Sequence, residues 1–169
     1  MEERIGLIQG DITVEQVDAV VNAANTSLLG GGGVDGAIHR AAGPGLAEIC
    51  RLLGGCEVGE AKVTPGLHLP AKYIIHTVGP VWKGGNNEEP GKLANCYRSI
   101  LEQANQHDCN TVAIPNISTG VYHFPKQLAA EIAIHETRAF LASHSIPQTV
   151  TFVCFDQENF NIYRNLLNS

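Results

Sequence analysis

The sequence lacks long hydrophobic runs and a surplus of positive charge. No stretch approaches the ~18 apolar residues needed to span a bilayer, and the opening MEERIGLIQGD has no apolar region of the kind found in signal peptides. The 169 residues carry 11 Lys and Arg against 17 Asp and Glu, a formal net charge of -6. Such a charge disfavours long-range attraction of bare nucleic acid. We therefore expect a cytoplasmic protein without a membrane partner, and nucleic acid is disfavoured as a partner.

The sequence also lacks the common metal-binding and nucleotide-hydrolysing motifs. HExxH is absent because Ala139 stands where a second histidine would follow His135-Glu136, and GxxxxGK[ST] does not occur. The cysteines form an odd set with neither CxxC spacing nor a histidine pair at ligand distance: Cys50, Cys56, Cys96, Cys109 and Cys154. We expect reduced, mostly buried thiols, no bound metal and no cofactor.

Short β-branched runs alternate with longer helical patterns along the chain, which is typical of a layered α/β domain. With 44% hydrophobic residues the chain can build one continuous core, and we expect a single domain over residues 1–169. The predicted strands are Ile5–Gln9, Ala19–Asn22, Lys72–Val78, Thr111–Ile114 and Val150–Phe155.

Helices are predicted between these strands and after the last one. Over Lys92–His107, apolar residues recur on one narrow face that should cover the sheet: Leu93, Tyr97, Ile100, Leu101 and Ala104. A second helix begins at Pro125 and carries a broad apolar stripe: Leu128, Ala129, Ile132, Ala133 and Phe140. A third is expected from about Gln157 to Leu167, and the polar stretch Lys83–Pro90 is expected to be a surface loop.

Two predicted strands run directly into unusual loops. The first loop, 22–36, contains four consecutive glycines before a helical pattern from about Val34 to Ala42, and the second, 115–125, carries Ser118, Thr119 and Gly120. Glycines allow main-chain N–H groups to approach a ligand closely, and ligands of open α/β sheets bind beyond the carboxyl ends of strands. Because residues 22–35 and 115–125 contain no Lys or Arg, a phosphate there would be held by backbone dipoles.

These loops also match simpler or competing patterns. The glycine run could be a flexible surface turn, and Ser118–Gly120 could be ordinary loop chemistry. Gly31-x-Gly33-x-x-Gly36 satisfies the dinucleotide fingerprint, but a polar turn separates it from the strand and Glu57 is not at the end of a second strand. The GxSxG elbow of serine hydrolases is incomplete, because Asn116 precedes Ser118 by two residues.

At these loops the sequence resembles a known family, the MacroD-type macrodomains, most closely the bacterial O-acetyl-ADP-ribose deacetylases. The matching motifs follow in order along nearly the whole chain: GDI at Gly10–Ile12, VNAAN at Val21–Asn25, GGGGVDGAIHRAAG at Gly30–Gly43, HTVGP at His76–Pro80 and ISTGVY at Ile117–Tyr122. The resemblance implies a three-layer α/β/α fold, a mixed and mostly parallel sheet of six strands, and a cleft for ADP-ribose.

The resemblance also implies roles for individual residues. Asp11 and the Ile12 main chain would contact the adenine, and Phe155 would stack on it. The diphosphate would be enclosed by two loop segments: Gly32, Gly33 and Val34 in one, and Ser118, Thr119, Gly120, Val121 and Tyr122 in the other. Phe124 would line the same site, although His123-Phe124 replaces the Gly-Tyr that is common in the family. Asn25 would hold the distal ribose, Asp35 would position the hydrolytic water, and His39 would support them.

Plainer roles exist for most of these residues. Asp35 could be a first-turn acid stabilised by the helix dipole, which would lower its pKa, whereas a bound diphosphate would raise that pKa again. Asn25 could be a strand-end cap, Asp11 an N-cap and His39 a packing residue. Tyr122 and Phe124 could belong to the core at the Pro125 helix entrance.

The leading hypothesis for function is a hydrolase of O-acyl-ADP-ribose, or of ADP-ribose esterified to Asp or Glu of proteins. The partners would then be ADP-ribose, O-acyl-ADP-ribose and mono-ADP-ribosylated proteins. One alternative is a reader domain that binds ADP-ribose without turnover. Another is a module for nucleic acid or poly-ADP-ribose, which the net charge of -6 and the lack of a basic stripe disfavour.

Overall fold

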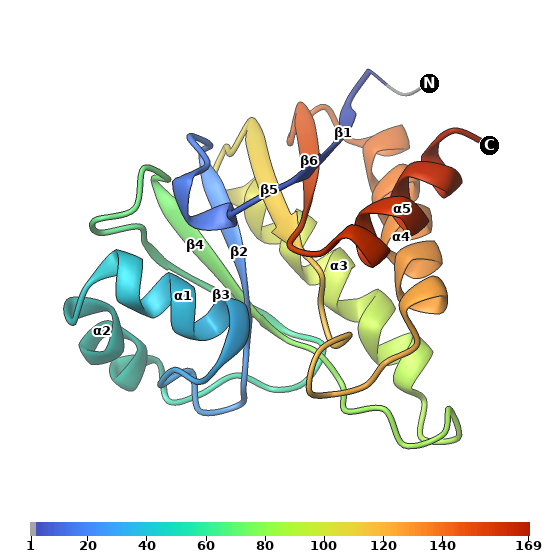
Figure 1. Cartoon of the computed structure of the whole chain (residues 1–169). Coiled ribbons are helices and arrows are strands. Elements are labelled where there is room, and N and C mark those ends of the chain that lie inside the picture. Colours follow the sequence, from blue (N-terminus) through green and yellow to red (C-terminus); the bar gives the residue numbers. More distant parts are fainter. Residues whose placement is uncertain (1–2) are drawn as a thin grey trace.

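A six-stranded sheet forms the centre of the computed structural model, which describes residues 3–169 (Figure 1). Met1 and Glu2, which belong to the opening segment and to the single domain expected over 1–169, lie outside the described residues. The strands lie in the order β1-β6-β5-β2-β4-β3, and every neighbouring pair is parallel except β3 and β4. The strand bounds are β1 Ile5–Gln9, β2 Ala19–Ala24, β3 Ala61–Pro65, β4 Tyr73–Val78, β5 Thr111–Pro115 and β6 Thr149–Cys154.

Helices cover both faces of this sheet, which confirms the expected three-layer α/β/α fold. The helices are η1 Ile12–Val14, α1 Gly33–Ala42, α2 Gly45–Leu53, α3 Glu89–Gln106, α4 Lys126–Ser143 and α5 Gln157–Leu167. In Figure 1, α1 and α2 lie on one side of the sheet, and α3, α4 and α5 lie on the other. No helix within residues 3–169 combines the length and the hydrophobicity needed to cross a bilayer.

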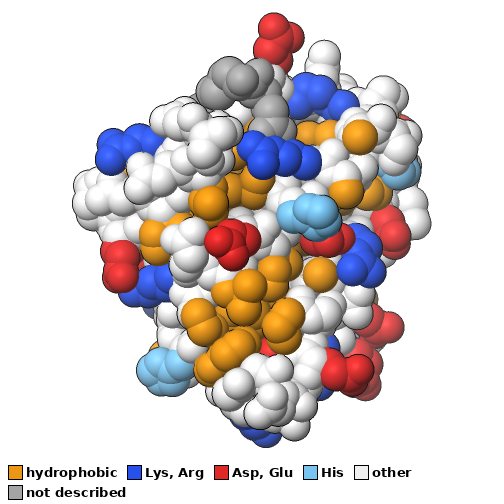
Figure 2. Space-filling model, turned by 90° about the vertical axis from the view of Figure 1, so that its right-hand side faces the viewer, with side chains coloured by type: hydrophobic (Ala, Val, Ile, Leu, Met, Phe, Trp, Pro, Cys, Tyr) orange, Lys and Arg blue, Asp and Glu red, His pale blue; other side chains and the backbone are white. Residues whose placement is uncertain are grey.

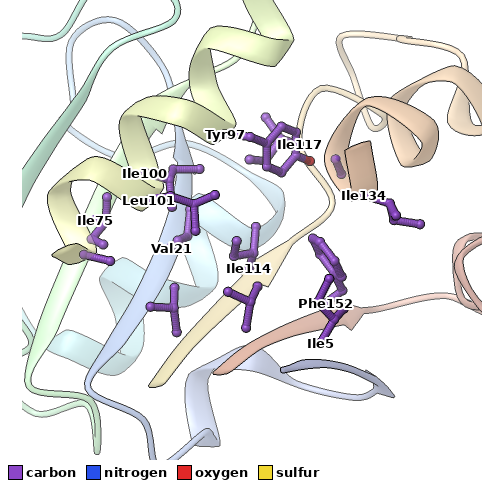
Figure 3. Close-up of a cluster of buried hydrophobic side chains, with 14 of the residues drawn as sticks. Ile5, Val21, Ile75, Tyr97, Ile100, Leu101, Ile114, Ile117, Ile134 and Phe152 are labelled. Atoms are coloured by element: carbon purple, nitrogen blue, oxygen red, sulfur yellow. The ribbon is translucent and has the colours of Figure 1, made fainter. Parts of the chain in front are cut away.

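The hydrophobic core has one part on each face of the sheet because successive strand residues point to opposite faces. Val20 and Ile74 pack with residues of α1 and α2, whereas Val21 and Ile75 pack with residues of α3 and α4. Figure 3 shows the second cluster, in which Tyr97, Ile100 and Leu101 of α3 and Ile134 of α4 lie against strand residues. All five cysteines are buried, as the sequence predicted.

Most predicted elements agree with the structure within a few residues. The five apolar residues predicted for one face of α3 are all buried. That helix begins at Glu89, so the predicted loop Lys83–Pro90 extends two residues too far. Helix α2 and strand β3 were not predicted from the sequence. Strand β3 is an edge strand of only five residues, AKVTP, and its alternation of apolar and polar residues is too short a signal to stand out.

Candidate active site

The two predicted ligand loops lie at the same edge of the sheet. Strands β1, β6, β5 and β2 are consecutive, parallel neighbours, so their carboxyl ends point the same way. Asp11 follows β1, Phe155 follows β6, loop 116–124 follows β5 and loop 25–32 follows β2. With strands ~4.8 Å apart, the four strand ends form a row about 14 Å long. Sheet order therefore places Asp11 and Phe155 at one end of this row and Asn25 at the other.

The glycine loop 30–33 brings free main-chain amides to the N-terminus of α1. The N-cap of α1 is Gly32, which has no side chain to accept from the first N–H groups of the helix. Gly33 has φ +57°, a left-handed conformation that favours glycine. A Cβ on Gly36 would lie 2.5 Å from the Gly31 carbonyl oxygen, so the loop packs directly on the first turn of α1. This helix end is therefore suited to an anion.

Asp35 lies in the first turn of α1 and is 4% exposed. Its Oδ1 accepts a hydrogen bond of 2.9 Å from Nδ2 of Asn22. Burial raises the pKa of Asp35, while the Asn22 donor and the charge of His39 each lower it, with a net increase. From the sequence, the helix dipole alone was expected to lower the pKa of Asp35. The net shift is upward, because burial has the larger effect. A buried carboxylate with a raised pKa is suited to act as a general base.

Asn25 caps its own loop, as the plainer interpretation expected. Its Oδ1 accepts from the Ser27 and Leu28 main-chain N–H groups and from the Ser27 hydroxyl, and its Nδ2 donates to the Gly30 carbonyl at 2.9 Å. A Cβ placed on Gly31 would lie 3.5 Å from Asn25 Nδ2 and 3.1 Å from Asp35 Oδ2. The amide of Asn25 and the carboxylate of Asp35 therefore flank the same point of the glycine loop.

The loop between β5 and α4 forms the second wall of the site. Ser118 has φ +68° and a buried Oγ with no hydrogen-bond partner among the described residues. The Ser118 carbonyl accepts from the Phe124 N–H at 2.9 Å, and the Gly120 carbonyl accepts from the His123 N–H at 3.0 Å, so the loop folds back on itself. Thr119 and Tyr122 are half-buried, and Gly120 and Val121 are exposed. These residues are available to a ligand at the surface.

Phe124 belongs to the core, not to the exposed wall of the site. Its ring is 1% exposed and packs edge-on against Trp82 at 4.9 Å between centroids. The N–H of Trp82 donates to the Tyr122 carbonyl at 2.9 Å, which ties the segment after β4 to this loop. Of the two roles considered for Phe124 from the sequence, the structure therefore bears out the core role. The ring offers a ligand almost no surface.

The expected adenine end is an exposed apolar ring next to a capped turn. Phe155 is 77% exposed, so most of its ring surface is open to a ligand. Asp11 caps η1, because its Oδ1 accepts from the N–H and the hydroxyl of Thr13, and these bonds lower its pKa. Ile12 is buried, so only its main chain is placed to contact a ligand.

Three polar residues buried beside Asp35 were not predicted as part of the site: Asn22, Thr64 and His76. Asn22 was named as the end of a strand, the start of the first loop and part of a motif, and His76 as part of a strand and a motif, but neither was given a role in the site. A signal was present, because both are polar residues inside apolar strand sequences, VVNAA and YIIHTV. Within residues 3–169, this site included, no group of three or more His, Cys, Asp or Glu side chains is placed to hold a metal ion.

Comparison with known proteins gives a consistent family. The Macro domain family model matches residues 21–133. A macro domain-containing protein of Lactiplantibacillus plantarum is 58% identical over 165 residues, covering 96% of this chain and 95% of that protein. An O-acetyl-ADP-ribose deacetylase of Cronobacter sakazakii is 52% identical over 171 residues, covering 99% of this chain and 95% of that protein.

Solved structures agree with the sequence relatives. The Oceanobacillus iheyensis macrodomain with ADP superposes with a TM-score of 0.92 at 42% identity, covering 96% of this chain and 88% of that one. The Trypanosoma brucei macrodomain in complex with ADP-ribose has a TM-score of 0.92 at 45% identity, covering 97% and 69%. The chain belongs to the macro domain family.

Proposed function

We propose that the protein binds ADP-ribose along the row of strand ends and hydrolyses an acyl ester on the distal ribose. The substrates are O-acetyl-ADP-ribose and mono-ADP-ribose esterified to Asp or Glu of proteins. The names of the Cronobacter relative and of the ADP and ADP-ribose complexes support this proposal. Phe155 and Asp11 would take the adenine end, the two loops the diphosphate, and Asn25 the distal ribose.

The observation that carries the proposal is the buried carboxylate of Asp35 at the N-terminus of α1. Asp35 Oδ2 lies close to Gly31 and Asn25, where the ribose ester would be placed. The carboxylate would take a proton from water as the water oxygen attacks the ester carbonyl carbon. The helix amides would stabilise the resulting oxyanion. When the tetrahedral intermediate collapses, the bond to the ribose oxygen breaks, and the proton passes to that oxygen.

A reader domain that binds ADP-ribose without turnover is the competing function. Asn25 and Asp35 both occupy the end of the row where the ester would lie, and this favours the hydrolase. A nucleic-acid module is disfavoured by the net charge of -6. On the face over α4 and α5, the basic side chains stand apart from one another among acidic and apolar ones (Figure 2). A cytoplasmic location stays a prediction.

The experiment combines calorimetry with ADP-ribose and release of acetate from O-acetyl-ADP-ribose. For Asp35→Ala we expect binding within about threefold of wild type and kcat lower by roughly 10²–10⁴, because the general base is lost. For Asn25→Ala we expect weaker binding and slower release. Asp108→Asn is the matched control, since this exposed residue lies before β5 and therefore at the opposite edge of the sheet.

Four outcomes would change the proposal. Saturable binding without acetate release selects the reader. No binding removes the site itself. Near wild-type turnover by Asp35→Ala would assign activation of the water to a phosphate of the ligand. Release of ADP-ribose from a peptide carrying it on a glutamate ester tests the protein substrate, and its absence would restrict the activity to the free metabolite.

A further inference from the structure

A line of buried polar side chains crosses the sheet beneath Asp35. Thr64 on β3, His76 on β4 and Asn22 on β2 all point to the face covered by α1 and α2, and Asn22 and His76 are register partners. Oγ1 of Thr64 lies 2.8 Å from Nε2 of His76, and Nδ1 of His76 lies 3.1 Å from Nδ2 of Asn22. That same Nδ2 donates to Asp35 Oδ1 at 2.9 Å. All four side chains are at most 4% exposed.

The hydrogen bonds of this line determine the tautomer of His76. An amide Nδ2 has two hydrogens, and in Asn22 one points to Asp35 and the other to His76. Nδ1 of His76 must therefore accept, so the neutral ring carries its hydrogen on Nε2 and donates it to Thr64. Burial lowers the pKa of His76 to about 4, with a further contribution from His39, which keeps the ring neutral at physiological pH.

The tautomer of His76 and the orientation of the Asn22 amide are therefore coupled, and a change in one would favour a change in the other. If the hydrogen of His76 were on Nδ1, that N–H would face the N–H of the Asn22 amide, and the two donors would repel each other. The amide group would then tend to rotate so that its oxygen faces His76 and Asp35. That oxygen would then face the Asp35 carboxylate and repel its ionised form. The Asn22 oxygen has no partner among the described residues, so the amide orientation is explained by its two donor bonds.

The two oxygens of Asp35 consequently have different surroundings. Oδ1 is held by Asn22 and lies 3.5 Å from Nε2 of His39. Oδ2 faces Gly31 in the ligand loop. We propose that Thr64, His76 and Asn22 are positioning residues, which fix the Asp35 carboxylate through the tautomer of His76 and leave Oδ2 to the hydrolytic water. This inference rests on the proposed hydrolase function, since it names the residues that prepare its base.

The titratable groups around Asp35 come from three elements. His39 is on α1 itself, His76 approaches from β4 through Asn22, and Cys50 of α2 is close enough for Asp35 to raise its pKa. Because burial already raises the pKa of Cys50, the thiol stays neutral near pH 7. The Asn22 donor and His39 are thus the groups that lower the pKa of Asp35, and removing the donor should raise it.

The test compares His76→Leu and Thr64→Val with wild type, with acetate release from O-acetyl-ADP-ribose measured from pH 5 to 9. We expect kcat to fall by about ten- to a hundredfold in His76→Leu because the carboxylate is misplaced. The acid limb of the kcat profile should move up by about half a unit to one unit, since the Asn22 donor to Asp35 loses the partner that orients it. Thr64→Val should change in the same direction to a smaller extent, and Thr64→Ser, which keeps the hydroxyl, should restore the profile.

Thr77→Val is the matched control. Thr77 is the next residue of β4, is fully buried, and donates from Oγ1 to the Glu60 carbonyl on the other face of the sheet. The Thr77→Val variant should have a lower thermal stability than wild type, but the same pH profile of kcat. ADP-ribose affinity should stay within about threefold of wild type in all four variants, because none of these residues lines the two loops.

The carboxyl carbon of Asp35, titrated by nuclear magnetic resonance, supplies a reading that does not depend on turnover. A higher Asp35 pKa in His76→Leu and Thr64→Val than in wild type supports the positioning role even if the protein proves to be a reader. The positioning role is overturned if the pKa of Asp35 is unchanged in His76→Leu and Thr64→Val, and if kcat in these variants falls only as far as their loss of stability explains, as in the control Thr77→Val. If His76→Leu does not fold, the pair Thr64→Val and Thr64→Ser decides between these outcomes.

Discussion

The imidazole of His39 lies one helical turn beyond Asp35 on α1, with Nε2 3.5 Å from Oδ1 of the carboxylate. This distance is within ion-pair range, but Nε2 makes no hydrogen bond with any described residue. Burial raises the pKa of Asp35, and His39 is one of two groups that lower it. We therefore expect His39 to lower the pKa of Asp35 through its charge, in addition to the plainer role of a packing residue.

Replacing His39 by Gln should make the activity more sensitive to acid. Without the positive charge, the pKa of Asp35 rises, and a larger fraction of the base is protonated at any pH below that value. We expect acetate release to fall by about two- to fivefold at pH 5.5 and to change little at pH 8.5. A pH profile of kcat tests this, with ADP-ribose affinity as the control. An equal loss at every pH would assign His39 to packing alone.

Phe155 should contribute to binding but not to stability. Its ring is 77% exposed, so truncation removes almost no buried surface from the folded protein. Stacking of a base on an aromatic ring is worth about 1–3 kcal/mol, so Phe155→Ala should weaken ADP-ribose binding by roughly 5- to 150-fold. Calorimetry measures the affinity, and thermal unfolding should be unchanged. Leu52→Ala, an 88% exposed residue on α2, is the control for loss of an exposed apolar side chain.

Gly36 and Gly32 should respond differently to the same added methyl group. A Cβ on Gly36 would lie 2.5 Å from the Gly31 carbonyl oxygen, whereas a Cβ on Gly32 would meet nothing within 4 Å. Gly36→Ala should therefore displace the loop, lower stability by about 1–3 kcal/mol and weaken ADP-ribose binding at least tenfold. Gly32→Ala should keep the stability of wild type. If its affinity also stays unchanged, the ligand does not approach Gly32 as closely as the proposed site requires.

The sequence was sufficient to predict the strand ends that carry the site, because each is a short buried run followed by a distinctive loop. Helix α3 was also predictable, since an apolar face that recurs regularly over four turns is typical of a helix packed on a sheet. The contact between Asn22 and His76 was not, because these residues are 54 apart and meet only through the register of β2 and β4. The pKa of Asp35 is raised, whereas the helix dipole alone was expected to lower it. This direction depends on burial, which a local sequence motif does not indicate.

Glu89 should make the stability of the fold depend on pH in a defined range. Its carboxylate is 1% exposed and accepts hydrogen bonds from the main-chain N–H groups of Lys83, Gly85 and Asn87 at 2.7, 3.2 and 2.7 Å. Burial alone would raise the pKa of Glu89, but the N–H donors outweigh it and lower the pKa to about 2 from an ordinary value of 4.5. The carboxylate thereby holds the loop that connects Trp82 to α3.

Because the folded-state pKa of Glu89 is depressed, its stabilising contribution is fully present above about pH 4.5 and is lost as pH falls toward 2. Urea unfolding of wild type and Glu89→Gln should therefore show a large difference in stability at pH 7, a smaller one at pH 3.5 and almost none near pH 2. Glu88→Gln is the matched control, because Glu88 is the neighbour of Glu89 in the sequence and its side chain is exposed. This variant should have the same stability as wild type at each pH. A constant difference between wild type and Glu89→Gln over this range would mean that the carboxylate stabilises the loop by packing, without a contribution from its charge.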